Sequence, residues 1–232
     1  DEGQLRVGRR LATKLLHAGR FVLALGGPGA GGATDPLDRA MLARLAEVVD
    51  EATLAFEAYE PARALEAGEA CFWTFCDQYL ELVKGRAYGE AGRAGQASAG
   101  GALRLGLDTM VRLFAPVLPF ATEEVWSWWR PGSVHASPWP EGGPLRAATG
   151  VERPSPLALE VATAVLSEVR RAKTLAKLSL RTPVARLEVA DHPDRLAALG
   201  EVTGDLCRAG RVADLVVLGP AEGLSVKVVL AD

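Results

Sequence analysis

The sequence has 232 residues, of which 49% are hydrophobic and 24% are charged, a composition typical of a folded globular protein. It excludes a disordered or fibrous chain, and no apolar run is long enough to cross a bilayer. The formal net charge is −3, so the average charge gives no indication of nucleic-acid binding. Three cysteines in a chain of this length favour a reducing compartment over a disulfide scaffold, and we expect a cytoplasmic protein.

The charges are distributed unevenly along the chain. Residues 3–34 contain five cationic side chains and no acidic one, whereas residues 35–82 are rich in acids. A second acid-free run extends from Arg170 to Arg186. Two basic stripes on an acidic body suit a polyanion that docks in one orientation. Solvated helix faces would give the same pattern, so charge alone leaves both interpretations open.

The first part of the chain predicts a succession of helices. Residues 5–25 have helical periodicity, and the Gly-rich run 26–34 is predicted to be a linker. The pair Asp35-Pro36 is typical of an N-cap followed by the first helical residue, which predicts a helix to about Tyr59. A further helix is predicted from Pro61 to about Tyr88.

The next segment contains both flexible and helical patterns. Residues 90–101 are predicted to be a flexible loop because they are dominated by Gly, Ala and Ser. Two further helices are predicted over residues 102–114 and 122–129, and Pro116 and Pro119 separate them. We therefore expect an antiparallel helix bundle over residues 1–132, followed by a connecting segment over 133–156 that is rich in Pro and Gly.

After Pro156 the pattern predicts a small α+β domain over residues 157–232. Helices are expected over 157–178 and 194–208, and strands over 184–190, 213–218 and 224–230. The last two strands are joined by a short turn, which predicts an antiparallel three-stranded sheet. The predicted fold class is thus mainly α, with a helix bundle followed by a small α+β domain.

The sequence contains no recognisable catalytic or metal-binding constellation. Its histidines, His17, His135 and His192, lie in separate segments without an adjacent nucleophile. Cys71 and Cys76 diverge on a predicted helix, and no cluster has the spacing of zinc ligands, so they are expected to be core thiols. We predict no catalytic residue, no metal site and no cofactor in this chain.

One arc of the first predicted helix combines cations with an aromatic residue. Leu11, Leu15 and Val22 gather on the side expected to pack into the bundle. The opposite arc carries polar and cationic side chains together with one aromatic ring: Arg6, Arg9, Arg10, Thr13, Lys14, His17, Arg20 and Phe21. Phe21 either contributes to a binding surface or folds back under a neighbouring helix.

Two further cationic groups are candidates for binding. Lys84 and Arg86 end the helix that begins near Trp73, where they can favour the helix C-terminus or meet a phosphate. Arg170, Lys173 and Lys177 share one face of a predicted helix at spacings of three and four residues. A solvated face is the alternative interpretation of this second group.

Several continuous segments carry a family-like pattern. They include GRRLATKLLHAGRFVL (8–23), WTFCDQYLELVKGRAYG (73–89) and FAPVLPFATEEVWSWW (114–129). In this order they resemble the first helix, the signature helix and the final helix pair of the anticodon-binding bundle, which follows the catalytic fold in class I aminoacyl-tRNA synthetases. SVHASPWP (133–140) resembles the stretch that follows the bundle in the valyl enzymes in particular. VLSEVRRAKTLAKLSLRTPV (165–184) resembles the helix and strand that open their next module.

The resemblance implies a portion of an ATP-dependent ligase for valine and its tRNA, one that binds the anticodon stem and loop. The implied partners are the valine tRNA and the catalytic domain of the same polypeptide, and we expect a monomer. Phe21 is predicted to stack on an anticodon base, Lys14 and Arg10 to hold phosphates, and His17 to reach a base edge or sugar. The complete set of predicted tRNA-binding residues is Arg10, Lys14, His17, Arg20, Phe21, Lys84, Arg86, Arg170, Lys173 and Lys177.

The resemblance does not extend to catalysis. Neither the HIGH nor the KMSKS signature that such enzymes use to bind ATP is present, and the chain begins without Met. We therefore expect a fragment that is inactive alone, with ATP needed only by the absent catalytic domain. The alternative function is a helical protein-protein interaction module without RNA binding.

Overall fold

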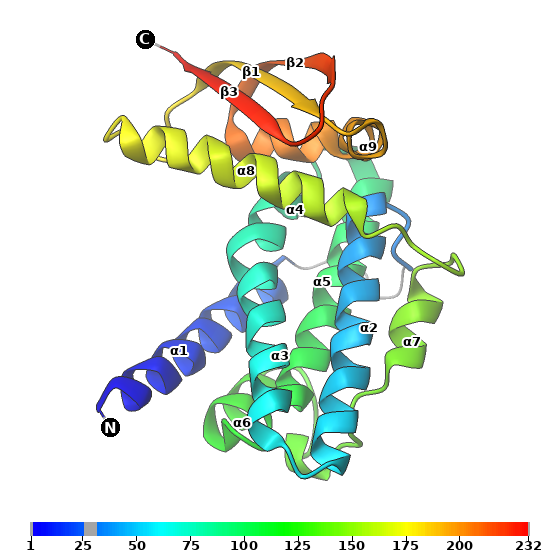
Figure 1. Cartoon of the computed structure of the whole chain (residues 1–232). Coiled ribbons are helices and arrows are strands. Elements are labelled where there is room, and N and C mark those ends of the chain that lie inside the picture. Colours follow the sequence, from blue (N-terminus) through cyan, green and yellow to red (C-terminus); the bar gives the residue numbers. More distant parts are fainter. Residues whose placement is uncertain (1, 26–31, 232) are drawn as a thin grey trace.

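The computed structural model describes residues 2–25 and 32–231, and it is predominantly helical (Figure 1). The predicted fold class, a helix bundle followed by a small α+β part, is confirmed. The bundle consists of the following helices: α1 (Glu2–Ala24), α2 (Pro36–Glu57), α3 (Pro61–Thr74), α4 (Leu80–Ala87), α5 (Gly92–Phe114) and α6 (Pro119–Ser127). The predicted linker over 26–34 lies mostly outside the described residues.

The start of α2 is determined by local sequence. The Oδ1 atom of Asp35 accepts a hydrogen bond from the backbone N–H of Leu37 at 3.1 Å, and Pro36 occupies the first turn. Asp35 is therefore the N-cap that the sequence predicts. Proline also occupies the first turn of α6. This helix begins at Pro119, earlier than the predicted residue 122.

A π-helical turn, Phe75–Tyr79, joins α3 to α4 within the predicted helix from Pro61 to Tyr88. The helical character of this segment is confirmed, but its periodicity gave no indication of the wider turn. Phe75, Cys76 and Tyr79 are buried, while Asp77 projects from the same turn toward solvent. Single π turns inside α-helices are frequent at functional sites.

The prediction of a flexible loop over residues 90–101 is wrong, because α5 already begins at Gly92. The small side chains bring α5 close to the rest of the bundle, and Ser98 and Ala99 are buried. The Ser98 hydroxyl donates to Asp38 and accepts hydrogen bonds from the backbone N–H groups of Thr34 and Asp35. Tertiary packing thus stabilises a helix that composition alone does not predict.

The connecting segment packs along the bundle. It contains the short helices η2 (Val134–Ala136) and α7 (Gly142–Ala148), and α7 lies beside α2 (Figure 1). The indole Nε1 of Trp139 donates to Thr53 of α2 at 2.9 Å, and Arg146 forms an ion pair with Asp50. These contacts hold the segment against α2.

The α+β part comprises α8 (Leu157–Leu175), β1 (Val184–Asp191), α9 (Pro193–Gly210), β2 (Val212–Pro220) and β3 (Ser225–Leu230). Among the described residues these strands form one sheet in the order β2-β1-β3. β1 pairs with β2 in parallel and with β3 antiparallel, so the prediction of an antiparallel sheet is wrong. The reason is that α9 provides the long crossover that parallel strands need, and β1 then separates β2 from β3.

The helix α8 connects the two parts of the molecule. It lies across one end of the bundle, with the sheet on its other side (Figure 1). Val161, Val165 and Val169 of α8 are fully buried, and they belong to a hydrophobic cluster that includes described residues from both the bundle and the α+β part. Burial of shared apolar surface is thus one of the interactions that hold the two parts together.

Candidate functional site

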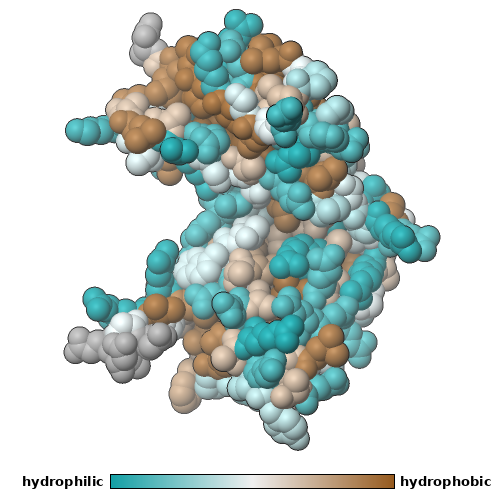
Figure 2. Space-filling model, in the orientation of Figure 1, coloured by the Kyte–Doolittle hydropathy of each residue, from teal (hydrophilic) through white to brown (hydrophobic). Residues whose placement is uncertain are grey.

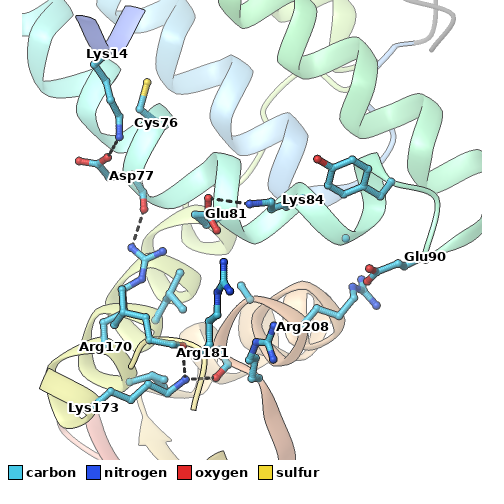
Figure 3. Close-up of a pocket in the computed structure, with 18 residues that line it drawn as sticks. Lys14, Cys76, Asp77, Glu81, Lys84, Glu90, Arg170, Lys173, Arg181 and Arg208 are labelled. Atoms are coloured by element: carbon cyan, nitrogen blue, oxygen red, sulfur yellow. Dashed lines mark hydrogen bonds and ion pairs between the residues drawn. The ribbon is translucent and has the colours of Figure 1, made fainter. Parts of the chain in front are cut away.

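A cleft of about 940 Å³ opens between the bundle and the α+β part. Figure 2 shows a hollow on the side from which α1 and α8 project, and Figure 3 shows the residues that line the cleft. One wall consists of α1, the π turn and α4, and the other of α8, the segment that follows it, and the end of α9. The fold therefore places residues far apart in the sequence on facing walls.

Cationic side chains outnumber acidic ones in the cleft. The acidic residues that line it are Asp77, Glu81 and Glu90. The cationic residues come from both walls: Lys14, Lys84, Arg170, Lys173, Arg181, Arg208 and Arg211. Arg181 and Arg211 have no carboxylate within ion-pair distance in the described part of the chain. An excess of positive charge in a concave surface favours an anionic ligand.

Two of the predicted residues in the cleft already have acidic partners. Lys14 of α1 forms an ion pair with Asp77, and Lys84 lies 3.5 Å from a carboxylate oxygen of Glu81. All four side chains are substantially exposed, so each pair is worth only about 0–1 kcal/mol. A phosphate group that enters the cleft can therefore compete for both ammonium groups.

Arg170 joins the two walls. Its Nη1 donates a hydrogen bond of 2.7 Å to the carbonyl oxygen of Asp77 in the π turn. The same residue lines the cleft, so its guanidinium still faces the space that a ligand would occupy (Figure 3). The sequence predicts Arg170 as a binding residue, but it gives no indication of the hydrogen bond to Asp77.

A second basic pocket adjoins the cleft. This groove, of about 450 Å³, is lined by Arg6, Arg9, Arg10, Thr13, Lys14 and His17 of α1 together with Trp73 and Asp77. Three of the predicted residues, Arg10, Lys14 and His17, thus lie together along one side of α1. Lys14 and Asp77 line both the groove and the cleft.

The assignment of Arg86 to tRNA binding is contradicted by its burial. Only 3% of its side chain is exposed. Its guanidinium forms hydrogen bonds of 2.7–2.8 Å to Asp38 and of 2.7 Å to Asp205. Asp35 lies 3.3 Å away, and burial, opposed by the charge of Arg86, raises the pKa of that carboxyl. Arg86 is therefore a structural residue that ties α2 and α4 to α9.

The assignment of Lys173 is contradicted for the same reason. The residue is 1% exposed, and its Nζ donates to the carbonyl oxygens of Leu180 and Gly210 at 3.1 and 2.8 Å. Burial, with the nearby charges of Arg211 and Arg170, lowers the pKa of Lys173. Although it lies at the base of the cleft, its ammonium group holds the segment after α8 against the end of α9.

Three other predicted residues, Lys177, Arg20 and Phe21, line neither the cleft nor the groove. Lys177 is exposed, but α8 ends at Leu175 and Lys177 adopts a left-handed φ of 56°, so it does not share a helix face with Arg170. The guanidinium of Arg20 lies 5.5 Å from the ring centroid of Trp128, on the side of α1 that faces α6.

Phe21 is partly buried, and its ring packs against neighbouring side chains. Its ring makes an edge contact with Tyr88 at 6.3 Å between centroids, and the Nζ of Lys84 lies 5.5 Å from its centre. It is half-buried against the hydrophobic core. These contacts favour the alternative that the sequence left open, in which the ring folds under a neighbouring helix.

Sequence reasoning missed Trp73, Arg181, Arg208 and Arg211 as pocket residues. Arg181 lies in the second acid-free run of the sequence, which could have indicated it. For Trp73 the sequence indicates only the start of a family-like helix. Arg208 and Arg211 flank the end of α9, and only the packing of α9 against α4 places them beside the bundle.

The described residues give no evidence for a metal centre. Within that part of the chain no three His, Cys, Asp or Glu side chains are grouped in a way that would hold a metal ion. The three buried or partly buried carboxylates near Arg86, those of Asp35, Asp38 and Asp205, are instead paired with that guanidinium. Among the described helices, none combines the length and the apolar character that a membrane span needs.

Residues 38–190, well over half of the chain, match the family described as the anticodon-binding domain of tRNA ligase. The chain therefore belongs to this family of tRNA-ligase domains, which implies tRNA as its partner. It is similar to valine–tRNA ligases, being 47% identical to that of Salinispora tropica and 50% identical to that of Thermobifida fusca, each over 93% of this chain. It is also 44% identical to the valine–tRNA ligase of Cutibacterium acnes, over 100% of this chain. The chain spans only about a quarter of these relatives, 27%, 24% and 26% respectively.

Proposed function

We propose that this chain is the tRNA-binding part of a valine–tRNA ligase and that the anticodon stem and loop of valine tRNA docks in the cleft. The observation that carries this proposal is the facing arrangement of cations in the cleft, with Lys14 and Lys84 on one wall and Arg170 and Arg181 on the other. The match to the anticodon-binding family and the similarity to valine–tRNA ligases support the identity of the ligand.

The chemistry of the cleft suits an RNA backbone. Arginine and lysine hold phosphate oxygens and fix the orientation of the strand, while base contacts provide sequence recognition. Arg181 and Arg211, which have no carboxylate partner among the described residues, would take phosphates without breaking an ion pair. Lys14 and Lys84 would exchange weak surface pairs for phosphate contacts.

The remaining activities belong to the ligase as a whole. It would attach valine to its tRNA using ATP, in a catalytic domain that is part of the same polypeptide. We place the protein in the cytoplasm and expect it to act as a monomer. The isolated chain should show no valine-dependent pyrophosphate exchange and no tRNA charging, and measurable exchange by the pure chain would contradict this assignment.

A titration with valine tRNA at two salt concentrations tests the RNA-binding role. We expect binding that weakens steeply with salt, because phosphate contacts release counterions. Arg181→Ala should lower the salt slope by about one unit, and Arg211→Gly should do the same. Glycine is preferred at residue 211 because its φ is 54°, in the left-handed region.

The control for this titration is Arg153→Ala, which removes an exposed arginine that lines neither pocket. It should leave the slope unchanged. A protein-protein interaction module would instead show no salt-dependent tRNA binding, and that result would refute the proposed function.

A further inference from the structure

Trp73 presents an indole to the groove beside α1. The residue lies in the last turn of α3 and is half-buried, with its ring tilted against Phe72 at 5.9 Å between centroids. Its Nε1 donates to Glu69 at 2.9 Å, which fixes the orientation of the ring. The guanidinium of Arg10 lies 4.7 Å from the ring centre. The indole is thus held in place by the protein while its remaining surface lines the groove.

The groove around this indole is strongly cationic. Arg6, Arg9 and Arg10 line it, and none of them has a carboxylate within ion-pair distance among the described residues. The acidic side chain that lines it in the described structure is Asp77, which is already paired with Lys14. A rigid aromatic ring surrounded by unpaired arginines combines the two features that single-stranded nucleic acids require of a binding surface.

The groove is continuous with the cleft through one ion pair. Lys14 and Asp77 line both pockets, so this pair marks the boundary between them. An RNA strand held in the cleft that passes Lys14 therefore reaches the groove, with Arg10 and His17 on its path.

The energies favour a base over the guanidinium that covers Trp73 in the free protein. A cation–π contact at an exposed site is worth a factor of about two to five in an equilibrium constant, and its loss is offset once the guanidinium meets a phosphate. Stacking of a base on an aromatic side chain is worth a factor of about five to 150. A base can therefore displace Arg10 from the ring, and the flexible arginine side chain remains within the groove to bind the adjacent phosphate.

We propose that Trp73 is a base-stacking residue for RNA. An unpaired nucleotide of the strand that leaves the cleft past Lys14 stacks on the indole, while Arg6, Arg9 and Arg10 hold the flanking phosphates. This inference rests on the proposed function, since it extends the RNA path from the cleft. It also replaces Phe21, whose ring packs against Tyr88 and beneath Lys84, as the stacking residue beside α1.

The test is Trp73→Leu, which keeps apolar contact with Phe72 but removes the stacking surface. With valine tRNA as the probe, the variant should bind about tenfold more weakly, the lower part of the range for one stacked base. Its salt slope should equal that of the parent, because no phosphate contact is lost. Arg10→Ala should instead lower the slope by about one unit.

Trp128 provides a matched control. Its Nε1 donates to Glu124, four residues earlier, as Trp73 does to Glu69, and it also lies beneath an arginine, Arg20. It lines neither the cleft nor the groove. Trp128→Leu should therefore bind valine tRNA as the parent does, so that a loss specific to Trp73 reports the groove and not the general loss of an indole.

A second readout covers the case in which Trp73→Leu does not fold. 2-Aminopurine is placed at each unpaired loop position of the tRNA in turn, and its fluorescence is compared between the parent and Trp73→Phe, which retains a smaller ring. At least one position should be quenched on binding, and less so by the Phe variant. If quenching depends on Trp73 at no loop position, the proposal is wrong. It is also wrong if Trp73→Leu and Trp128→Leu bind valine tRNA equally well.

The two proposals fail in different ways. If the parent shows salt-dependent binding that Arg181→Ala weakens, while Trp73 variants behave like the parent, the groove assignment is wrong and the cleft stands. If the parent does not bind valine tRNA at all, the proposed function itself is wrong.

Discussion

Burial separates arginines that look equivalent in the sequence. Arg86 and Arg181 both lie in segments that predicted contact with phosphate, yet Arg86 is enclosed by Asp38 and Asp205 whereas Arg181 faces the cleft. The environment of Arg86 contains more negative than positive charge, and burial of Asp35 raises the pKa of its carboxyl there. The guanidinium is therefore required to keep these carboxylates in the interior.

This arrangement predicts a large loss of stability for Arg86→Leu. Removing one partner from a buried charge network leaves the others uncompensated, which costs about 3–5 kcal/mol. Chemical denaturation measures the change in the free energy of unfolding. Arg63→Ala is the control, because Arg63 forms an exposed pair with Glu60 and its loss should cost less than about 1 kcal/mol. Similar losses for the two variants would show that the Arg86 network contributes little.

The three cysteines should differ in reactivity. Burial raises the pKa of Cys71 and of Cys76 to about 12, whereas Cys207 is only half-buried, and its pKa is also raised. Because the thiolate is the reactive form, a thiol reagent at about pH 8 should modify Cys207 first and the other two only after unfolding. Raising the pH further should accelerate the reaction of Cys207 before theirs.

Counting modified thiols by mass spectrometry checks this order. Cys207→Ser should leave the folded chain almost unreactive, while the denatured variant should react at both remaining cysteines. Rapid modification of Cys76 in the folded protein would contradict its burial beside the cleft.

At the scale of elements, α5 shows how small side chains act as packing residues. The backbone at Gly106 lies so close to Phe75 that an added Cβ would be 2.8 Å from the ring. Gly100 of the same helix faces open space, because beyond its own stretch of helix no described atom lies within 4 Å of such a Cβ. The close approach at Gly106 lets α5 pack directly on the π turn that carries Asp77.

These two positions predict opposite effects of the same substitution. Gly106→Ala should destabilise the protein by about 1–3 kcal/mol through overpacking against Phe75. Gly100→Ala should stabilise it by about 0.5–1 kcal/mol, since alanine restricts the unfolded chain and favours the helix. Thermal and denaturant unfolding of the two variants provides the comparison. Stabilisation by Gly106→Ala would mean that the ring of Phe75 moves aside readily.

In the molecule as a whole, the cleft is formed where the bundle and the α+β part meet. The bundle supplies Lys14 and Lys84, and the α+β part supplies Arg170, Arg181 and Arg211. Their relative positions depend on the buried contacts between Arg86 and Asp205 and on the packing of α8 across the bundle. Structural residues thus determine the shape of the surface without contacting a ligand.

Lys14 and Asp77 form an ion pair at the boundary between the cleft and the groove, and we expect that breaking this pair increases the affinity for RNA. Asp77→Asn removes one acid from both pockets and releases Lys14 for a phosphate, while the backbone carbonyl that accepts from Arg170 is retained. Valine tRNA should bind about two- to fivefold more tightly, with a salt slope steeper by about one unit. Glu152→Gln, at an exposed residue outside both pockets, is the control. Weaker binding by Asp77→Asn would indicate that the ion pair itself positions Lys14 for RNA.

Features that depend on near neighbours follow from the amino-acid sequence alone. The N-cap at Asp35 and the periodicity of α1 follow from residues a few positions apart, and the family-like segments were recognisable as continuous strings. The same periodicity placed Arg10, Lys14 and His17 on one side of α1, where the structure finds them lining the groove.

Which polar groups remain available to a ligand depends instead on packing between segments that are distant in the sequence. Arg86 and Lys173 are buried because acids or carbonyl oxygens from distant segments surround them, and no local pattern reports those partners. The helix at residues 92–101 and the central position of β1 likewise depend on packing between remote elements. Trp73 lies beside the cations of α1 for the same reason: burial and charge are set by contacts across space, whereas periodicity and capping are set along the chain.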